Sequence, residues 1–214
     1  LQEEVVSARP AADAKLPLDR IKQYEKLSDA EILAAYSANL DQNIKRDQTE
    51  GNDGKIIAAA EMVSQARRVC VAGFRACSGF AASIGVMLTC VRPDVFVVGE
   101  NGPLVDSLID LGKDDVMLAV SFERYSSSAA FAVQMAHDAG CRVIALTDSY
   151  AAPVAKGAEE VIVCSSGNMS FFDSYVSFLI NMEKILLLVS KRNKEANEAR
   201  LLRMESYLQK NGQY

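Results

Sequence analysis

The chain has 214 residues, of which half are apolar and 24% are charged, and its formal net charge at pH 7 is −5. This size and apolar content fit one α/β domain with additional helices. The acidic balance argues against nucleic-acid binding by these residues, because such binding depends on Lys and Arg neutralising phosphates. No apolar run reaches the roughly 18 residues of a membrane span. We therefore predict no membrane contact and a cytoplasmic location.

The cysteines indicate a reducing compartment. There are five of them, and no two form a Cys-x-x-Cys pair. Cys70, Cys141 and Cys164 fall in or beside predicted strands, where cysteine behaves as a small apolar residue. We therefore predict no disulfide framework and no metal site. No cofactor is predicted either.

The first segment, residues 1–27, is predicted to be a linker. Its first 17 residues are polar and rich in Ala, with Pro10 and Pro17 as breaks. The sequence begins with Leu rather than Met, which suggests an excised piece or a processed chain. We therefore expect another domain upstream of this linker.

Helical patterns follow the linker. Ser28-Asp-Ala-Glu31 has the form of a capping box, and apolar residues then recur every four positions, at Ile32, Tyr36, Leu40 and Ile44. This pattern predicts a helix of about 18 residues from position 28. Asn52 is predicted to cap the next helix.

From residue 68 onwards the chain alternates between predicted strands and helices. The strands lack polar alternation, which is typical of parallel strands that are covered on both faces. The pattern predicts an α/β fold with a flavodoxin-like, doubly wound, five-stranded parallel sheet, order 2-1-3-4-5, and extra N- and C-terminal helices. The strands are expected at about 68–72, 95–98, 116–121, 142–147 and 160–164, and the helices at about 78–91, 103–111, 127–139, 151–157, 171–191 and 195–209.

Two loops in this pattern carry the candidate site. The first loop runs from Gly73 to Ser78, and the second contains four serines and a tyrosine between Ser121 and Ser128. In the predicted order, strands 1 and 3 end side by side. The loops at 73–78 and 121–128 should therefore meet at one opening, which is called the mouth below. Each loop also opens a helix, whose free N–H groups favour an anion.

The side chains of these loops suit a phosphate or a sugar. Four hydroxyls exceed the needs of one helix cap, although Ser78 alone would be an ordinary cap. Arg75 and Arg124 could supply countercharge, the alternative for Arg124 being a local pair with Glu123. The first loop is not a dinucleotide fingerprint, because Arg75 stands where the middle glycine is required, and it is not a P-loop. The predicted ligand-binding residues are Gly73, Arg75, Cys77, Ser78, Ser121, Arg124, Tyr125 and Ser126.

Catalytic alternatives have less support in the sequence. His137 is the single histidine, and its position near the end of a helix indicates a structural role far from the strand ends. A Ser-His-Asp hydrolase is therefore disfavoured. Asp148 follows the fourth strand, where it could be catalytic, but capping a turn is the commoner role.

Three segments resemble the sugar isomerase (SIS) domain: the strand-Gly-x-x-x-[Ser/Cys] loop at 73–78, Ala-Val-Ser-x-x-x-x-Ser at 119–126 and Val-Ile-Ala-Leu-Thr-Asp-Ser at 143–149. The Phe-Glu-Arg-Tyr-Ser version of the second loop, behind a linker and a capping-box helix, is similar to RpiR-type bacterial transcription regulators. Compared with the family pattern, Cys77 takes the place of a serine and Arg75 that of a glycine, while Glu123-Arg124 replaces Ser-Gly.

The resemblance implies that residues 28–214 are an SIS effector-binding domain and that residues 1–27 lead from a missing DNA-binding domain. It implies a phosphosugar effector, a homo-oligomer (dimer or tetramer), and contact with DNA only through the upstream domain. We therefore predict an effector sensor without catalytic activity. The alternative is a sugar-phosphate isomerase, for which Glu123 and His137 are candidate bases.

Overall fold

A five-stranded sheet forms the centre of the computed structural model, which describes residues 17–49, 51–100, 102–168, 170–192 and 194–212. All its strand pairs are parallel, and the strand order is β2-β1-β3-β4-β5. This confirms the predicted doubly wound topology. The strands are β1 (Val69–Gly73), β2 (Val95–Val98), β3 (Val116–Val120), β4 (Arg142–Thr147) and β5 (Glu160–Val163).

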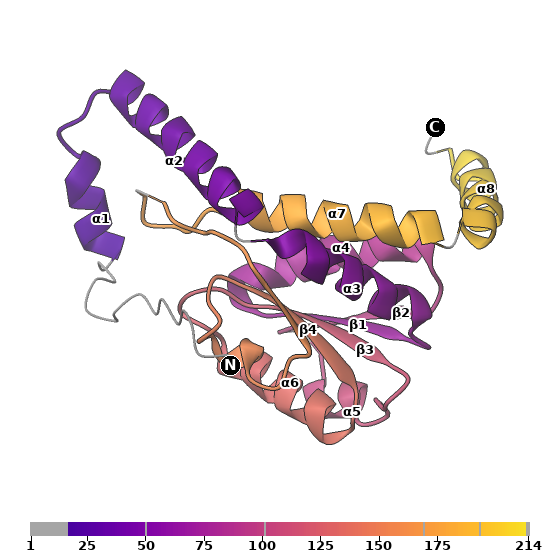
Figure 1. Ribbon diagram of the computed structural model, residues 1–214. Coiled ribbons are helices and arrows are strands. Elements are labelled where there is room, and N and C mark those ends of the chain that lie inside the picture. Colours follow the sequence, from indigo (N-terminus) through magenta and orange to yellow (C-terminus); the bar gives the residue numbers. More distant parts are fainter. Residues whose placement is uncertain (1–16, 50, 101, 169, 193, 213–214) are drawn as a thin grey trace.

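Helices cover both faces of the sheet (Figure 1). Successive side chains of a strand point to opposite faces, so Val69 and Val71 of β1 join one core while Cys70 and Ala72 join the other. The first core lies under α3, α4 and α7, and the second under α5 and α6. The helices are α1 (Pro17–Tyr24), α2 (Asp29–Thr49), α3 (Asn52–Gln65), α4 (Ser78–Val91), α5 (Leu104–Leu108), α6 (Ser127–Asp138), α7 (Val176–Arg192) and α8 (Lys194–Lys210), with short 3-10 helices η2 (Arg75–Cys77) and η3 (Pro153–Ala155).

The register of the sheet aligns the two predicted loops. Val69 pairs with Val116 at the start of β1 and β3, and Gly73 pairs with Val120 at their end. Both strands therefore end at the same level of the sheet. The loops that follow them start side by side, at the strand edge where α/β sheets bind ligands.

The helix expectations need three corrections. The helix predicted at 151–157 is the single 3-10 turn η3, with Pro153 at its start. The helix predicted from 171 begins only at Val176. Asn52 does not cap α3: Gly51 occupies that position with φ 72°, and the buried Asn52 amide donates to the Val163 carbonyl at 2.8 Å.

The N-terminal helices form an arm that projects from the body near one end of α7, while α8 stands at the other end (Figure 1). The capping box at the start of α2 is confirmed, because the Ser28 backbone N–H donates to the Glu31 carboxylate at 2.8 Å and the Glu31 N–H to Ser28 Oγ at 3.4 Å. Most of the predicted linker, residues 1–16, lies outside the described residues, and residues 17–24 form α1. Among the helices described, none has the length and apolar character needed to cross a membrane.

Candidate functional site

Gly73 allows β1 and α4 to approach each other closely at the base of the first loop. A Cβ at this position would lie 2.5 Å from the Cys77 carbonyl oxygen and 2.7 Å from Ala81 Cβ. No side chain can be accommodated at such distances. In the structure, Gly73 therefore shapes the site by packing.

The two arginines of the predicted site both adopt left-handed backbone conformations. Arg75 has φ 54° and Arg124 has φ 62°, and the described residues contain one other non-glycine residue with positive φ, Asp94. Such conformations cost about 1–2 kcal/mol in an L-residue and concentrate at functional sites. Each arginine lies three residues before the first residue of the helix that follows its loop. Backbone strain at this position in both loops supports a functional role for the pair.

Arg75 also ties the two loops together. Its guanidinium Nη1 donates to the carbonyl oxygen of Arg124 at 3.0 Å, while its backbone N–H donates to the carboxylate of Glu100 at 2.7 Å. Glu100 follows β2, so this network joins loops after β1, β2 and β3. The structure thus brings Arg75 and Arg124 together, as the strand order requires, and adds a carboxylate that the sequence did not indicate.

The predicted hydroxyl and thiol groups lie at the starts of α4 and α6. Ser78 is the first residue of α4, and its hydroxyl donates to the Arg75 carbonyl at 2.8 Å. Ser126 immediately precedes α6, but its hydroxyl makes no capping hydrogen bond, so the expected use of one serine as a cap does not apply to it. Ser121 is buried at the end of β3. Cys77 is also buried, and burial raises the pKa of its thiol to about 11, so the thiol is neutral at pH 7.

Tyr125 pairs with Asp148 across the mouth. The Tyr125 hydroxyl donates to Asp148 Oδ1 at 3.0 Å, and Thr147 Oγ1 donates to the same oxygen at 3.3 Å. Burial raises the pKa of Asp148, and it also raises the pKa of Tyr125, with the nearby Asp148 charge acting in the same direction. Asp148 is thus a partly buried carboxyl group at the end of β4. From the sequence, the commoner role for Asp148 was to cap a turn. Its hydrogen bond with Tyr125 could not be predicted, because the two residues are 23 positions apart in the chain.

Aromatic rings support the second loop from below. Phe122, the residue after Ser121, packs edge-on against Tyr175 and Phe178, with ring centroids 5.2 Å and 5.6 Å away. Phe80 of α4 packs against the same two rings. These contacts fix the position of the second loop relative to α4 and α7.

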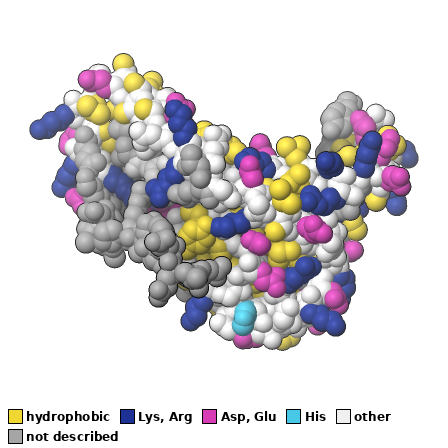
Figure 2. Space-filling model, viewed as in Figure 1, with side chains coloured by type: hydrophobic (Ala, Val, Ile, Leu, Met, Phe, Trp, Pro, Cys, Tyr) yellow, Lys and Arg dark blue, Asp and Glu magenta, His cyan; other side chains and the backbone are white. Residues whose placement is uncertain are grey.

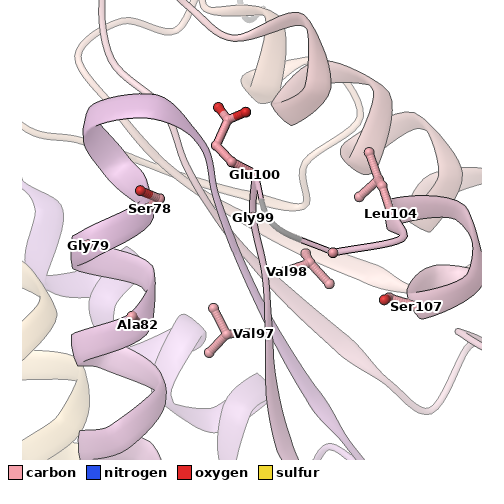
Figure 3. Close-up of a pocket in the computed structure, with 10 residues that line it drawn as sticks. Ser78, Gly79, Ala82, Val97, Val98, Gly99, Glu100, Leu104 and Ser107 are labelled. Carbon is pink, nitrogen blue, oxygen red and sulfur yellow. The ribbon is translucent and has the colours of Figure 1, made fainter.

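A cavity of about 480 Å³ opens beside the start of α4, on the β2 side (Figure 3). Ser78 and Gly79 form one wall, and Glu100 and Ser107 contribute polar groups on the other. The cavity adjoins the mouth through Ser78 and Glu100, both of which bond to Arg75. Sequence reasoning missed this part of the site. The Gly99-Glu100-x-Gly102 segment after the second strand was the available signal, because it ends a strand at the same edge.

The remaining candidates lie elsewhere or have other partners. Glu123 does not pair with Arg124: its carboxylate lies 3.5 Å from the guanidinium of Arg20. His137 is exposed in the last turn of α6, beside Asp138 and Gly157, far from the mouth because α6 runs back to the opposite edge of the sheet. The cysteines at 70, 141 and 164 are buried, as predicted. No cluster of three or more His, Cys, Asp or Glu side chains that could hold a metal ion occurs in the described part of the chain.

Comparisons with known proteins give the family context for this geometry. A family model described as the SIS domain matches residues 62–188. A search of curated proteins finds no match.

Three similar solved structures carry this domain or its fold. The sugar isomerase domain of an RpiR transcription factor from Sphaerobacter thermophilus has a TM-score of 0.75 and 25% identity, covering 81% of this chain and 97% of its own. NanR of Vibrio vulnificus, complexed with ManNAc-6P, has a TM-score of 0.71 and 15% identity, covering 87% of this chain and 71% of its own.

The third structure is a hypothetical protein of Methanococcus jannaschii, for which a 3-hexulose-6-phosphate isomerase function is inferred; it has a TM-score of 0.60 and 17% identity and covers 81% of this chain and 96% of its own. At these identities, the second and third structures bear on the fold alone. The family model spans more than half of the chain. The RpiR domain matches this chain over almost the whole length of that domain. The chain therefore belongs to the SIS domain family, and it is similar to the sugar isomerase domain of the RpiR transcription factor.

Proposed function

We propose that this chain is the effector-binding domain of a bacterial transcription regulator, and that it binds a phosphorylated sugar without converting it. The observation that carries the proposal is the junction of the two loops, where Arg75 bonds to the Arg124 carbonyl between the starts of α4 and α6. Helix N-termini and guanidinium groups both favour phosphate. In this proposal the linker leads to a DNA-binding domain upstream, the protein is a cytoplasmic homo-oligomer, and DNA contact belongs to the upstream domain.

The phosphate is held between the two loops, and the sugar extends into the adjoining cavity. Ser78, Ser121 and Ser126 are the proposed hydroxyl ligands, with countercharge from Arg75 and Arg124. The cavity volume of about 480 Å³ is within the range of small-molecule sites. Glu100 and Ser107 can accept hydrogen bonds from sugar hydroxyls there. The complex of NanR with ManNAc-6P, a phosphosugar, shows that a protein of this fold can bind a ligand of the proposed class.

Calorimetric titration with a panel of aldose and ketose phosphates, their unphosphorylated parents and inorganic phosphate tests the proposal. Arg124→Ala should weaken a phosphosugar by about 10- to 150-fold, because a charge-assisted hydrogen bond contributes about 1.5–3 kcal/mol. Arg203→Ala, which removes an exposed arginine on α8, is the control. If no anion binds at the mouth, or if Arg75→Ala and Arg124→Ala are both silent, the proposal is wrong.

A second arm locates the sugar. Ala82 lines the cavity from α4, so Ala82→Leu fills part of it without altering either loop. We expect this change to weaken the phosphosugar several-fold and to leave inorganic phosphate unaffected. Val86→Leu, at an exposed position one turn further along α4, should change neither. Equal loss of both ligands in Ala82→Leu would mean that the phosphate itself occupies the cavity.

The isomerase remains the second candidate, and Asp148 is the observation that favours it. A partly buried carboxyl group with a raised pKa at the mouth is a candidate acid or base. Of the two bases suggested by the sequence, Glu123 is held by Arg20 and His137 lies far from the mouth. Incubation with aldose and ketose phosphates should show no interconversion. Turnover that disappears in Asp148→Asn would establish the enzyme.

A further inference from the structure

The first helix of the chain reaches the candidate site through one side chain. Arg20 of α1 donates from Nη1 to Asp173 at 3.0 Å, and its Nη2 lies 3.5 Å from the carboxylate of Glu123. Glu123 belongs to the second loop, and Asp173 lies shortly before α7. One guanidinium therefore joins α1 to both sides of the mouth, across 103 and 153 residues of sequence.

This contact is more buried than a surface ion pair. The side chain of Arg20 is 18% exposed, and that of Asp173 only 8%. Exposed pairs contribute little, whereas a buried carboxylate that loses its partner destabilises the structure. Ile21 of the same helix remains 38% exposed. Among the described residues, Arg20 supplies the side-chain hydrogen bonds that join α1 to the body.

The residues bound by Arg20 also position the second loop. Glu123 adjoins Phe122 and Arg124, and Asp173 lies two residues before Tyr175, whose ring packs on Phe122. Arg20 therefore holds the loop from its outer side, while the aromatic contacts hold it from below. Loss of Arg20 would leave the carboxylates of Glu123 and Asp173 without their shared partner and remove the outer support of the second loop, while its aromatic contacts remain.

The base of the arm is anchored separately. Asn43 of α2 donates to the Gly167 carbonyl at 2.7 Å, and Asp47 accepts the backbone N–H of Ser165 at 2.9 Å. Both contacts fix the C-terminal half of α2 to the loop after β5. The contacts that hold the base of α2 are therefore separate from the Arg20 contacts that hold α1.

We propose that α1 is a closing strap of the effector site and that Arg20 is a positioning residue, acting on the ligand through Glu123 and the second loop. Ligand binding and α1 docking then stabilise each other, because coupling between two sites is reciprocal. A ligand bound at the mouth would thereby stabilise the docking of α1, and the docked helix would in turn affect the segment that precedes it. This inference rests on the proposed phosphosugar function.

Hydrogen exchange of the full chain, measured with and without the phosphosugar that binds best, tests the strap. In the wild type we expect the ligand to slow amide exchange in residues 20–27. Arg20→Ala should speed exchange in α1 without ligand, remove the protection by ligand, and weaken phosphosugar and inorganic phosphate by a similar factor of about 10, within the usual range for coupled sites. Arg20→Lys, which keeps the charge but loses the planar fork, should fall between. Lys22→Ala, an exposed cation on the same helix, should behave as wild type.

The outcomes separate the two proposals. If the wild type binds neither phosphosugar nor phosphate, the proposed function fails and the strap falls with it. If the ligand binds but leaves α1 exchange unchanged or accelerates it, only the strap is wrong. Equal α1 exchange in Arg20→Ala and wild type would also overturn it. A thermal denaturation curve for each variant, with a single cooperative transition, shows that loss of affinity is not loss of folding.

Discussion

At the scale of single residues, the site combines functional groups with backbone strain. Arg124 adopts φ 62°, a conformation that glycine adopts without penalty. An arginine at such a position is retained at an energetic cost, which is reasonable if its guanidinium serves the ligand. The same holds for Arg75 in the first loop, with φ 54°.

This strain gives a prediction that separates the backbone of Arg124 from its charge. Arg124→Gly and Arg124→Ala should weaken phosphosugar binding equally, since both remove the guanidinium. Arg124→Gly should nevertheless be more stable than Arg124→Ala by about 0.5–1 kcal/mol, because the strain relieved, about 1–2 kcal/mol, exceeds the entropy that glycine adds to the unfolded chain, about 0.4–1 kcal/mol. Urea denaturation measures the difference. An alanine variant as stable as the glycine variant would contradict the strained conformation.

The sequence indicated these residues but not their partners. Arg75 and Arg124 could be placed at one mouth from the strand order alone, because the carboxyl ends of adjacent parallel strands meet. The bonds from Arg75 to Glu100 and from Tyr125 to Asp148 depend on loop conformations. No periodicity records such conformations. The role of Arg20 could not be predicted from the sequence, because both of its partners lie more than 100 residues away.

At the scale of elements, one buried carboxylate joins the starts of β1 and β3. Asp115 accepts Arg67 Nε at 3.0 Å and Nη2 at 2.7 Å, Arg68 Nη2 at 3.1 Å, and the Gly112 backbone N–H at 3.1 Å. Burial alone would raise the pKa of Asp115, but the hydrogen bonds from Arg67 and Arg68 and their charges outweigh it and hold the pKa below its usual value. This network joins the starts of the two strands whose other ends carry the site.

Loss of the Asp115 charge should therefore destabilise the fold. Asp115→Asn should lower the free energy of unfolding by about 2–3 kcal/mol at pH 7, because charge-assisted bonds from two arginines are lost. A carboxyl group with a depressed native pKa stabilises the protein above its unfolded pKa, about 3.9, and that stability is lost as pH falls through the native pKa. The difference between wild type and variant should thus shrink in urea titrations below about pH 4. Asp114→Asn, at the exposed neighbouring position, is the control, and a constant difference down to acid pH would refute this assignment.

The elements themselves were largely predictable, and the exceptions have local causes. Parallel strands buried on both faces produce continuous apolar runs, so all five were located within about two residues. The helix expected at 151–157 failed because Pro153 and Gly157 confine it to one 3-10 turn, and Gly157 has φ 86°. The start of α7 was placed too early because Phe171 and Phe172 extend the apolar pattern, although both are exposed in the loop.

At the scale of the whole molecule, the two added helical regions leave apolar surface uncovered within one chain. Leu33 of α2 is 66% exposed, and Leu202 and Tyr207 of α8 are 62% and 59% exposed. Figure 2 shows hydrophobic side chains on the projecting arm. The sequence predicted an apolar pattern at Ile32, Tyr36, Leu40 and Ile44 of the first of these helices, but which apolar side chains stay exposed follows from tertiary packing. α2 projects from the body (Figure 1), and α8 is joined to it by hydrogen bonds from Asn197 to the Ser190 carbonyl and from Arg200 to the Thr89 carbonyl.

These faces predict association of the chain with itself. We expect at least a homodimer at tens of micromolar, because closed two-fold assemblies are the commonest way to cover such surfaces. Leu33→Lys and Leu202→Lys should each raise the dimer dissociation constant tenfold or more, corresponding to at least about 1.4 kcal/mol, because a charge would be placed in an apolar contact. Ile109→Lys, at an equally exposed position after α5, should have no effect, since it lies on the opposite face of the sheet from α2 and α8. Sedimentation velocity over a concentration series distinguishes these variants. A wild type that remains monomeric throughout the series would contradict the predicted homodimer.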